Sequence, residues 1–217
     1  MATEFIEITG GDLTQEEILR VVRGTSRDGG PLVRLNSETR AKLERTRKRI
    51  EDLWLQPGAP AIYGVNTGCG KLKDVQLSPE EIADFNQLYT LSHCVGAGDP
   101  LKNEVVHTSM LVRANQLSVG PSGVRAELID AILDLVNAQV IPVVPAGGSL
   151  GASGDLAPLS HIAAVLIGEP RAQAIYRGVV MAAPETLAAA GLKPISLMAK
   201  EGMALNNGAT VSLGHAV

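Results

Sequence analysis

The stretch GGSLGASGDLAPLSHI, residues 147–162, combines glycines, serines and one carboxylate directly before an apolar run. The glycines permit tight backbone turns and close approach of other groups. The stretch lacks the Gly-Lys-Ser/Thr ending of a phosphate loop and the spacing of a dinucleotide-binding loop. It also lacks the glycine that a nucleophile elbow needs two positions after Ser153. A flexible surface loop would have a similar composition. The apolar residues 156–167 predict a buried helix after the loop.

The tripeptide Ala152-Ser153-Gly154 can react with itself if the chain is sharply bent. The amide nitrogen of Gly154 can then attack the carbonyl carbon of Ala152 and close a five-membered ring, because glycine has no Cβ to block the approach. Loss of water from the ring and from Ser153 leaves an exocyclic methylene, which is an electrophile. Asp155 is placed to move protons. The helix predicted for residues 156–167 would add free amide hydrogens and a positive dipole beside Ser153.

This stretch resembles the signature of the aromatic amino-acid ammonia-lyases and aminomutases, in which an Ala-Ser-Gly triplet cyclises to 4-methylidene-imidazole-5-one (MIO). Further segments resemble the family in the same order, so that the resemblance runs from about residue 63 to residue 210. They are YGVNTGCGKLKD from Tyr63, LYTLSHCVGAGDPL from Leu88, RANQLSVGPSGVR from Arg113 and EGMALNNGAT from Glu201. The resemblance implies that MIO forms autocatalytically from residues 152–154.

The resemblance also assigns roles in two glycine-containing segments. Tyr63 matches the family's acid/base tyrosine on a mobile loop over the site, and the resemblance implies that a neighbouring subunit of the homotetramer supplies this tyrosine. Gly70 of the same loop is a candidate substrate-binding residue. Read without the resemblance, Tyr63 is a surface aromatic side chain lying on the core. Asn207 matches the asparagine beside the prosthetic ring, whereas Asn206 does not. Otherwise the two asparagines form a turn with Gly208.

Ser92-His93 falls at the position that selects the substrate in this family. The resemblance links a Ser-His pair to histidine ammonia-lyases, although some tyrosine aminomutases have a similar pair. A histidine can hydrogen-bond an imidazole ring, and a site that leaves a buried polar group unpaired loses affinity. A single histidine in such a place is otherwise a structural residue. Histidine is therefore the favoured substrate, with urocanate as the product.

The composition excludes several other classes of function. The net charge of -4 gives no basic surface for nucleic acid, and 45% hydrophobic residues can bury a sizeable core. Cys69 and Cys94 are too few for a disulfide framework, and no metal site is predicted. There is no signal peptide and no run of about 18 apolar residues, so that a cytoplasmic location without membrane contact is expected. Since only 3% of the residues are aromatic, the core must be aliphatic.

The pattern along the chain predicts a mainly α fold. A strand is expected over residues 4–9, an extended segment over 141–145, and a second strand over 176–181 in a hairpin around Pro170 and Arg171. Helices are expected over 14–23, 37–56, 78–91, 102–116, 124–140, 156–167 and 182–190, with a solvated charged face on the second of them. The chain then divides into a mixed, loop-rich N-terminal region (1–145) and the MIO loop with the start of a long helical bundle (146–217). By resemblance, this is the helical fold of the fumarase/aspartase superfamily.

The resemblance further implies an incomplete site. Relatives are more than twice as long, and their remaining tyrosine, arginine, glutamine and glutamate site residues lie beyond the matching part. The expected partners are an amino-acid substrate, the chain's own C-terminal half or a complementary chain, and further copies in a homotetramer. Three functions stay open: MIO-dependent elimination of ammonia, a tyrosine or phenylalanine 2,3-aminomutase, and an inactive assembly module with an uncyclised triplet.

Overall fold

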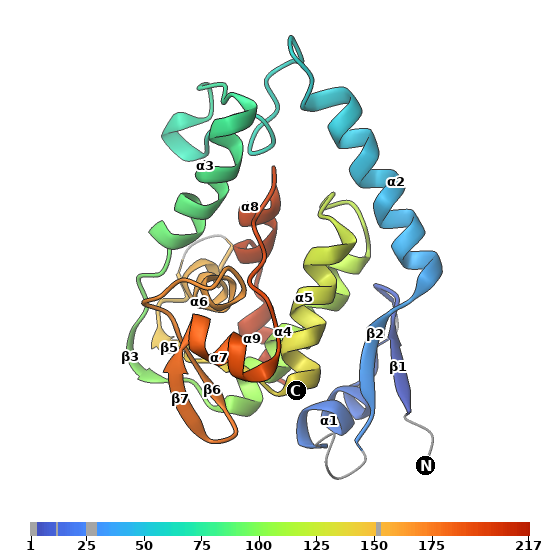
Figure 1. Cartoon of the computed structure of the whole chain (residues 1–217), viewed down its shortest axis with the longest axis vertical. Helices are drawn as coiled ribbons and strands as arrows, with labels where there is room; N and C mark the ends of the chain where they lie inside the picture. The colour runs from blue at the N-terminus through green and yellow to red at the C-terminus, as the bar shows by residue number, and fades with distance from the viewer. Residues whose placement is uncertain (1–3, 12, 25–29, 151–152) are drawn as a thin grey trace.

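The computed structural model describes residues 4–11, 13–24, 30–150 and 153–217. Helices dominate, as the sequence predicts (Figure 1). The helices are α1 (Gln15–Arg23), α2 (Ser37–Trp54), α3 (Pro79–Ser92), α4 (Asn103–Ser118), α5 (Ala126–Ala138), α6 (Leu156–Leu166), α7 (Ala183–Ala190), α8 (Glu201–Asn206) and α9 (Thr210–Gly214), with the 3-10 turn η1 (Gly70–Leu72). The strands are β1 (Phe5–Ile8), β2 (Leu32–Leu35), β3 (Ala97–Pro100), β4 (Ile141–Pro142), β5 (Pro145–Gly147), β6 (Gln173–Tyr176) and β7 (Val179–Ala182).

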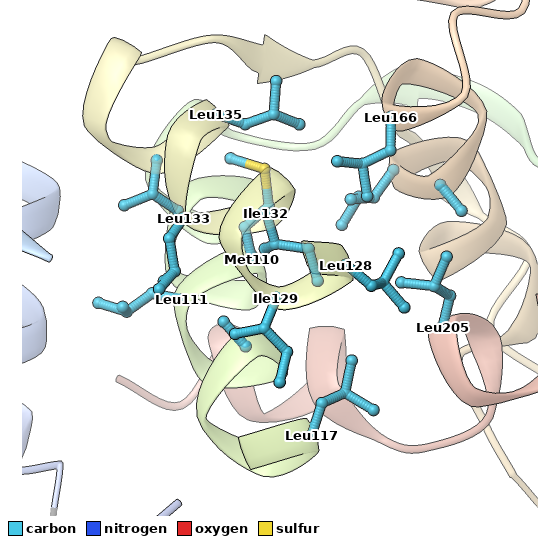
Figure 2. Close-up of a cluster of buried hydrophobic side chains, with 14 of the residues drawn as sticks. Met110, Leu111, Leu117, Leu128, Ile129, Ile132, Leu133, Leu135, Leu166 and Leu205 are labelled. Carbon is cyan, nitrogen blue, oxygen red and sulfur yellow. The ribbon is translucent and has the colours of Figure 1, made fainter. Parts of the chain in front are cut away.

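The hydrophobic core is centred on α4 and α5, and α6 and α8 close it from one side (Figure 2). Leu111, Leu128 and Ile129 are fully buried there. Among the described residues the buried hydrophobic side chains are aliphatic or methionine, which confirms the prediction of an aliphatic core. Each fully buried Leu, Ile, Val or Met side chain contributes roughly 1.5–3 kcal/mol to folding. The helix predicted for 124–140 is shorter, because Gln139 adopts a left-handed conformation with a φ of 55° and ends it.

The strands form three small sheets around the helices. β1 and β2 pair in parallel, with Phe5 opposite Leu32, and the first of them confirms the predicted N-terminal strand. β3 pairs with β5, and β4 pairs with β6, which in turn pairs with β7. The prediction of one strand over 176–181 is wrong, because the chain reverses inside it at Arg177 and Gly178, whose φ values are 51° and 81°. Glycine tolerates this left-handed geometry, so that the hairpin turns there rather than around residues 170–171.

Capping residues begin two of the helices where the sequence predicts. Thr14 and Ser78 each form a capping box with the glutamate three residues later. The charged helix α2 departs from its prediction at one position, because Arg47 is only 4% exposed. Its guanidinium donates to the carbonyl of Ala199 at 2.9 Å and pairs with Glu51 at 2.6 Å. The charged face of α2 is therefore not wholly solvated, and Arg47 attaches this helix to the segment before α8.

Three helices from distant parts of the sequence position the candidate site. α8 packs against both α3 and α6 (Figure 1). The amide of Gly202 in α8 donates to Asn86 Oδ1 in α3 at 2.9 Å, and a Cβ at Gly202 would lie 2.6 Å from the Asn86 carbonyl oxygen. α8 therefore contacts α3 more closely than any residue larger than glycine would allow. No helix of the described part of the chain is long and apolar enough to cross a membrane.

Candidate active site

The segment after β5 is bent directly before α6. The amide of Leu150 donates to the carbonyl of Gly154 at 2.7 Å, and the amide of Asp155 donates to the carbonyl of Ser153 at 3.1 Å. Gly154 has a φ of +79°, and a Cβ there would have no neighbour closer than 3.9 Å. Ala152 lies outside the described residues. Ser153 and Gly154 thus stand in a tight turn at the N-terminus of a buried helix, as the sequence predicts for the loop and for α6.

Asp155 ties this loop to the C-terminal part of the chain. Its carboxylate is fully buried and accepts three hydrogen bonds, from Ser149 Oγ at 2.7 Å, the Ser212 amide at 2.9 Å and Ser212 Oγ at 3.0 Å. Its own amide also donates to the carbonyl of Gly208 at 3.1 Å. Asp155 therefore holds residues 153–155 against α9 and the turn at 207–209. The sequence does not predict that Ser149 and Ser212 bind Asp155, because neither serine forms a recognisable sequence pattern with this residue.

Arg113 fixes the turn that carries Asn207. The side chain of Arg113 is only 8% exposed. Its Nε donates to the carbonyl of Leu205 at 3.1 Å, and its Nη2 donates to the carbonyls of Ala204 and Asn207, the latter at 2.8 Å. Burial lowers the pKa of Arg113 to about 10. An arginine bound to the last carbonyls of a helix stabilises the end of that helix. The sequence places Arg113 in a family segment without predicting this contact.

Asn207 itself lies at the surface, at the edge of a cavity of about 390 Å³. Arg113, Lys200 and Met203 also line this cavity. Lys200 Nζ donates to the carbonyl of Ser122 at 2.9 Å, and burial lowers the pKa of Lys200. The Asn207 side chain is thus available to a ligand, while its backbone is held by Arg113.

Tyr63 lies in a loop that is anchored from within. Asn66 Oδ1 accepts from the amide of Ile62 at 2.7 Å, and its Nδ2 donates to the carbonyl of Trp54 at 2.8 Å. The side chain of Tyr63 is 53% exposed, and its Oη accepts from the amide of Gly70 at 3.2 Å. The tyrosine therefore projects to solvent from a fixed loop, and the two residues predicted there contact each other.

Cys69 lies beside Tyr63 in this loop. Burial raises the pKa of the Cys69 thiol, and a side-chain hydrogen bond with Tyr63 opposes part of the rise. A Cβ at Gly64 would lie 2.6 Å from the terminal methyl carbon of Met203. The loop therefore rests directly on α8, the helix that ends at Asn206.

Ser92 and His93 end α3 and both bind the carbonyl of Tyr89. Ser92 Oγ donates to this carbonyl at 2.8 Å, and His93 Nδ1 lies 2.7 Å from it. The imidazole of His93 also lies against the phenol ring of Tyr89, with 4.5 Å between the ring centroids. Because a carbonyl oxygen only accepts, the contact requires a proton on Nδ1, which leaves Nε2 as an acceptor.

The structure thus brings the predicted site residues together in three groups. Residues 153–155 contact the turn at 207–209, Tyr63 contacts Gly70, and the pair 92–93 contacts Tyr89. α8 links the groups, because it contacts the Tyr63 loop, α3 and α6. In the described part of the chain no hydrogen bond joins Tyr63 to residues 153–155. Nor do the described residues contain a group of three His, Cys, Asp or Glu side chains that could hold a metal ion.

Comparison with known proteins identifies the family. The sequence model for the family described as aromatic amino acid lyase matches residues 13–217. Histidine ammonia-lyase of Deinococcus radiodurans is 45% identical over 197 residues, which are 91% of this chain and 36% of that relative. The solved tyrosine aminomutase of Streptomyces globisporus aligns with a TM-score of 0.83 at 30% identity, over 96% of this chain and 38% of the other. The solved histidine ammonia-lyase of Trypanosoma cruzi aligns with a TM-score of 0.83 at 28% identity, over 97% of this chain and 39% of the other.

The chain spans less than half the length of each of these relatives. The matched range 13–217 spans α1 to α9. The helical fold and the family resemblance expected from the sequence are both confirmed. The chain belongs to the aromatic amino acid lyase family.

Proposed function

We propose that this chain takes part in the elimination of ammonia from an aromatic L-amino acid, with histidine as the favoured substrate and urocanate as the product. The observation that carries the proposal is the turn at residues 153–155, which is bound through Asp155 to the turn that holds Asn207. The names of relatives at 40–45% identity support the substrate, since they are histidine ammonia-lyases. The chain supplies the electrophile loop and part of the site.

The residues present fit the MIO group that the family implies. The backbone is already bent at Ser153 and Gly154, and the Cβ side of Gly154 has no neighbour closer than 3.9 Å. Residues 152–154 would hold the group, which supplies an electrophilic methylene that accepts electron density from the substrate. Such an electrophile is useful because the β-proton of an amino acid is weakly acidic and ammonia leaves poorly. The N-terminus of α6 and the three donors on Asp155 keep the loop oriented.

Each remaining predicted site residue has a proposed role. Tyr63 would remove the β-proton with its phenol, which projects from the loop held by Asn66. Asn207 would orient the reacting groups at the edge of its cavity. Gly70 would bind substrate close to Tyr63, because its amide already donates to the phenol oxygen.

The Ser-His pair would select the aromatic ring of the substrate. With Nδ1 of His93 donating to the carbonyl of Tyr89, Nε2 can accept a hydrogen bond from an imidazole N–H. Ser92 supports the same carbonyl contact. A phenylalanine side chain offers no donor, so that it would leave Nε2 unpaired and bind more weakly.

A 2,3-aminomutase is the second candidate, since the tyrosine aminomutase of Streptomyces globisporus has the same fold at 30% identity. Such an enzyme returns the ammonia to the β-carbon. The proposed partners are the amino acid, the C-terminal half or a complementary chain, and further copies in a tetramer. The third candidate function, an inactive assembly module, also stays a prediction. So does the division of the chain into an N-terminal region (1–145) and the MIO loop with the start of the bundle (146–217).

Product analysis separates these functions. The chain should be combined with a C-terminal chain that completes the family's length and incubated separately with histidine, phenylalanine and tyrosine. Release of ammonia with urocanate supports the lyase, and β-amino acids in its place indicate the mutase. If no product forms and the polypeptide mass is unchanged, the result indicates the inactive assembly module.

A further inference from the structure

His161 lies on α6 and connects this helix to the segment that follows α3. Its side chain is partly buried, and its Nε2 accepts a hydrogen bond from the amide of Gly96 at 3.2 Å. Because an amide only donates, the contact requires an unprotonated Nε2 and therefore a neutral ring with its proton on Nδ1. Burial lowers the pKa of His161, which favours this neutral ring. His161 thus acts as a side-chain acceptor for the backbone at Gly96.

Gly96 belongs to the short segment that carries the Ser-His pair. The amide of His93 donates to the carbonyl of Thr90 at 3.2 Å, and the amide of Val95 donates to the carbonyl of His93 at 2.8 Å. Gly96 comes next, and its amide is the one that His161 binds. The backbone from His93 to Gly96 is therefore a compact turn that is attached to α3 at one end and to α6 at the other.

The start of the electrophile loop, residues 147–155, meets the same place. β3 pairs with β5, and Ala97 lies opposite Gly147 (Figure 1). A Cβ at Gly96 would lie 2.9 Å from His161 Nε2 and 3.3 Å from the carbonyl oxygen of Gly147. A Cβ at Gly148 would lie 3.2 Å from the Cα of Gly96. The segment after α3, the electrophile loop and α6 therefore meet in a contact that glycines make possible.

We propose that His161 is a positioning residue, which binds Gly96 at this junction and so fixes the place of the Ser-His pair relative to residues 153–155. Loss of the acceptor would leave a partly buried amide without a partner, and the turn from His93 to Gly96 would lose its attachment to α6. The imidazole of His93 could then move relative to the electrophile loop. The meaning of the contact for substrate selection rests on the proposed function.

The hydrogen bond can be tested on the chain itself by amide hydrogen exchange, followed for single residues by NMR. His161→Leu removes the acceptor and keeps an apolar side chain at this place. His161→Gln offers a carboxamide oxygen as a replacement acceptor, so that it should restore the bond. His215→Leu is the matched control, because it removes an exposed imidazole after α9.

We expect the amide of Gly96 to exchange about tenfold faster in His161→Leu than in the parent, the order expected for the loss of one hydrogen bond. In His161→Gln and His215→Leu its rate should stay within about twofold of the parent. The amide of Leu101, which donates to the carbonyl of Val144 at 2.8 Å, reports on loosening of the fold as a whole. Equal Gly96 rates in the parent and His161→Leu, or the same acceleration at Leu101, would overturn the proposal.

The effect on selection is measured in the completed enzyme with two competitive inhibitors, imidazolepropionate and phenylpropionate. These acids differ only in the ring, and without an α-amino group they cannot release ammonia. In His161→Leu the inhibition constant of imidazolepropionate should rise about fivefold, while that of phenylpropionate stays within about twofold, because only the imidazole loses its contact with His93. His161→Gln should restore the parent values.

A purely structural role of His161 would give a different result. A smaller amount of folded enzyme would lower the rate of the reaction and leave both inhibition constants unchanged. Unchanged constants in His161→Leu would therefore contradict the role in positioning. The exchange measurement needs no activity, so that failure of the proposed reaction can be told apart from failure of the bond between His161 and Gly96.

Discussion

At the scale of single residues, Arg113 has the largest set of contacts with the candidate site. Replacing Arg113 by Met keeps most of the side-chain volume but leaves the carbonyls of Ala204, Leu205 and Asn207 without their donor. We expect a loss of about 2–4 kcal/mol in the free energy of unfolding, measured by urea denaturation, since buried acceptors would lose a charged partner. Arg177→Met, at an exposed turn, is the control and should change stability by less than about 0.5 kcal/mol. Equal stability of the parent and Arg113→Met would show that the contacts do not hold the turn.

Buried histidines set the response of the fold to pH. Burial lowers the pKa of His107, although backbone hydrogen bonds with Val136 and Val22 oppose the effect, and burial also lowers the pKa of His161. Because the pKa of these histidines is lowered in the folded state, the unfolded chain binds protons below pH 6.5 that the folded chain does not bind. The free energy of unfolding is therefore retained above pH 6.5 and decreases as the pH falls below it. Each histidine contributes up to about 1.4 kcal/mol per pH unit in that window.

We therefore expect urea denaturation between pH 5 and 7 to show stability decreasing toward acid. His107→Leu should show a shallower decrease than the parent, because one of the two titrating groups has been removed. A decrease as steep in His107→Leu as in the parent would exclude His107 as a source of the pH dependence.

The sequence predicts the roles of individual residues less well than it predicts the helices. Tyr63, His93 and Asn207 came from resemblance, and the structure adds the contacts that hold them. Ser149 and Arg113 are not predicted to be supports. Ser149 binds Asp155 within the same loop, in no standard loop pattern, and Arg113 acts through contacts with residues far away in sequence. Arg47 was misassigned to a solvated face for the same reason, because its acceptor lies in the segment before α8.

At the scale of elements, the contact of α3 with α8 depends on Gly202. Gly202→Ala would place a Cβ 2.6 Å from the carbonyl oxygen of Asn86. Alanine favours helix by up to about 1 kcal/mol over glycine, whereas overpacking costs about 1–3 kcal/mol, and we expect the clash to dominate. Thermal unfolding should show a lower Tm for Gly202→Ala than for the parent. Gly11→Ala, where the nearest neighbour is 3.4 Å away, is the control, and a Tm of Gly202→Ala at or above that of the parent would contradict the close contact.

All seven helices that the sequence predicts are present, whereas α8, α9 and most of the strands are not predicted. The helices that follow the capping boxes at Thr14 and Ser78, and the helix that ends at Gly191, lie where the sequence predicts them, because local residues fix these ends. β2 is not predicted, because it is held by pairing with β1 across the intervening helix α1, a contact that no local pattern encodes. The apolar run over 176–181 resembles a single strand, whereas Gly178 inside it permits the turn of the hairpin.

At the scale of the whole molecule, one buried carboxylate joins two parts of the chain that are far apart in sequence. Asp155 connects the loop before α6 to α9, and this connection is the feature on which cyclisation of the triplet would depend. Asp155→Asn keeps the shape but cannot accept from all three donors, so we expect a loss of about 1–3 kcal/mol in stability by urea denaturation. A variant as stable as the parent would mean that the carboxylate does not hold the loop.

The most direct test of the account is the intact mass of the chain after expression together with the C-terminal part that completes the family's length. We predict a mass lower than that of the printed sequence by two water molecules, and Ser153→Ala should neither show that loss nor release ammonia from histidine at the parent's rate. A completed enzyme that releases ammonia while residues 152–154 keep the full mass of an ordinary peptide would contradict the account.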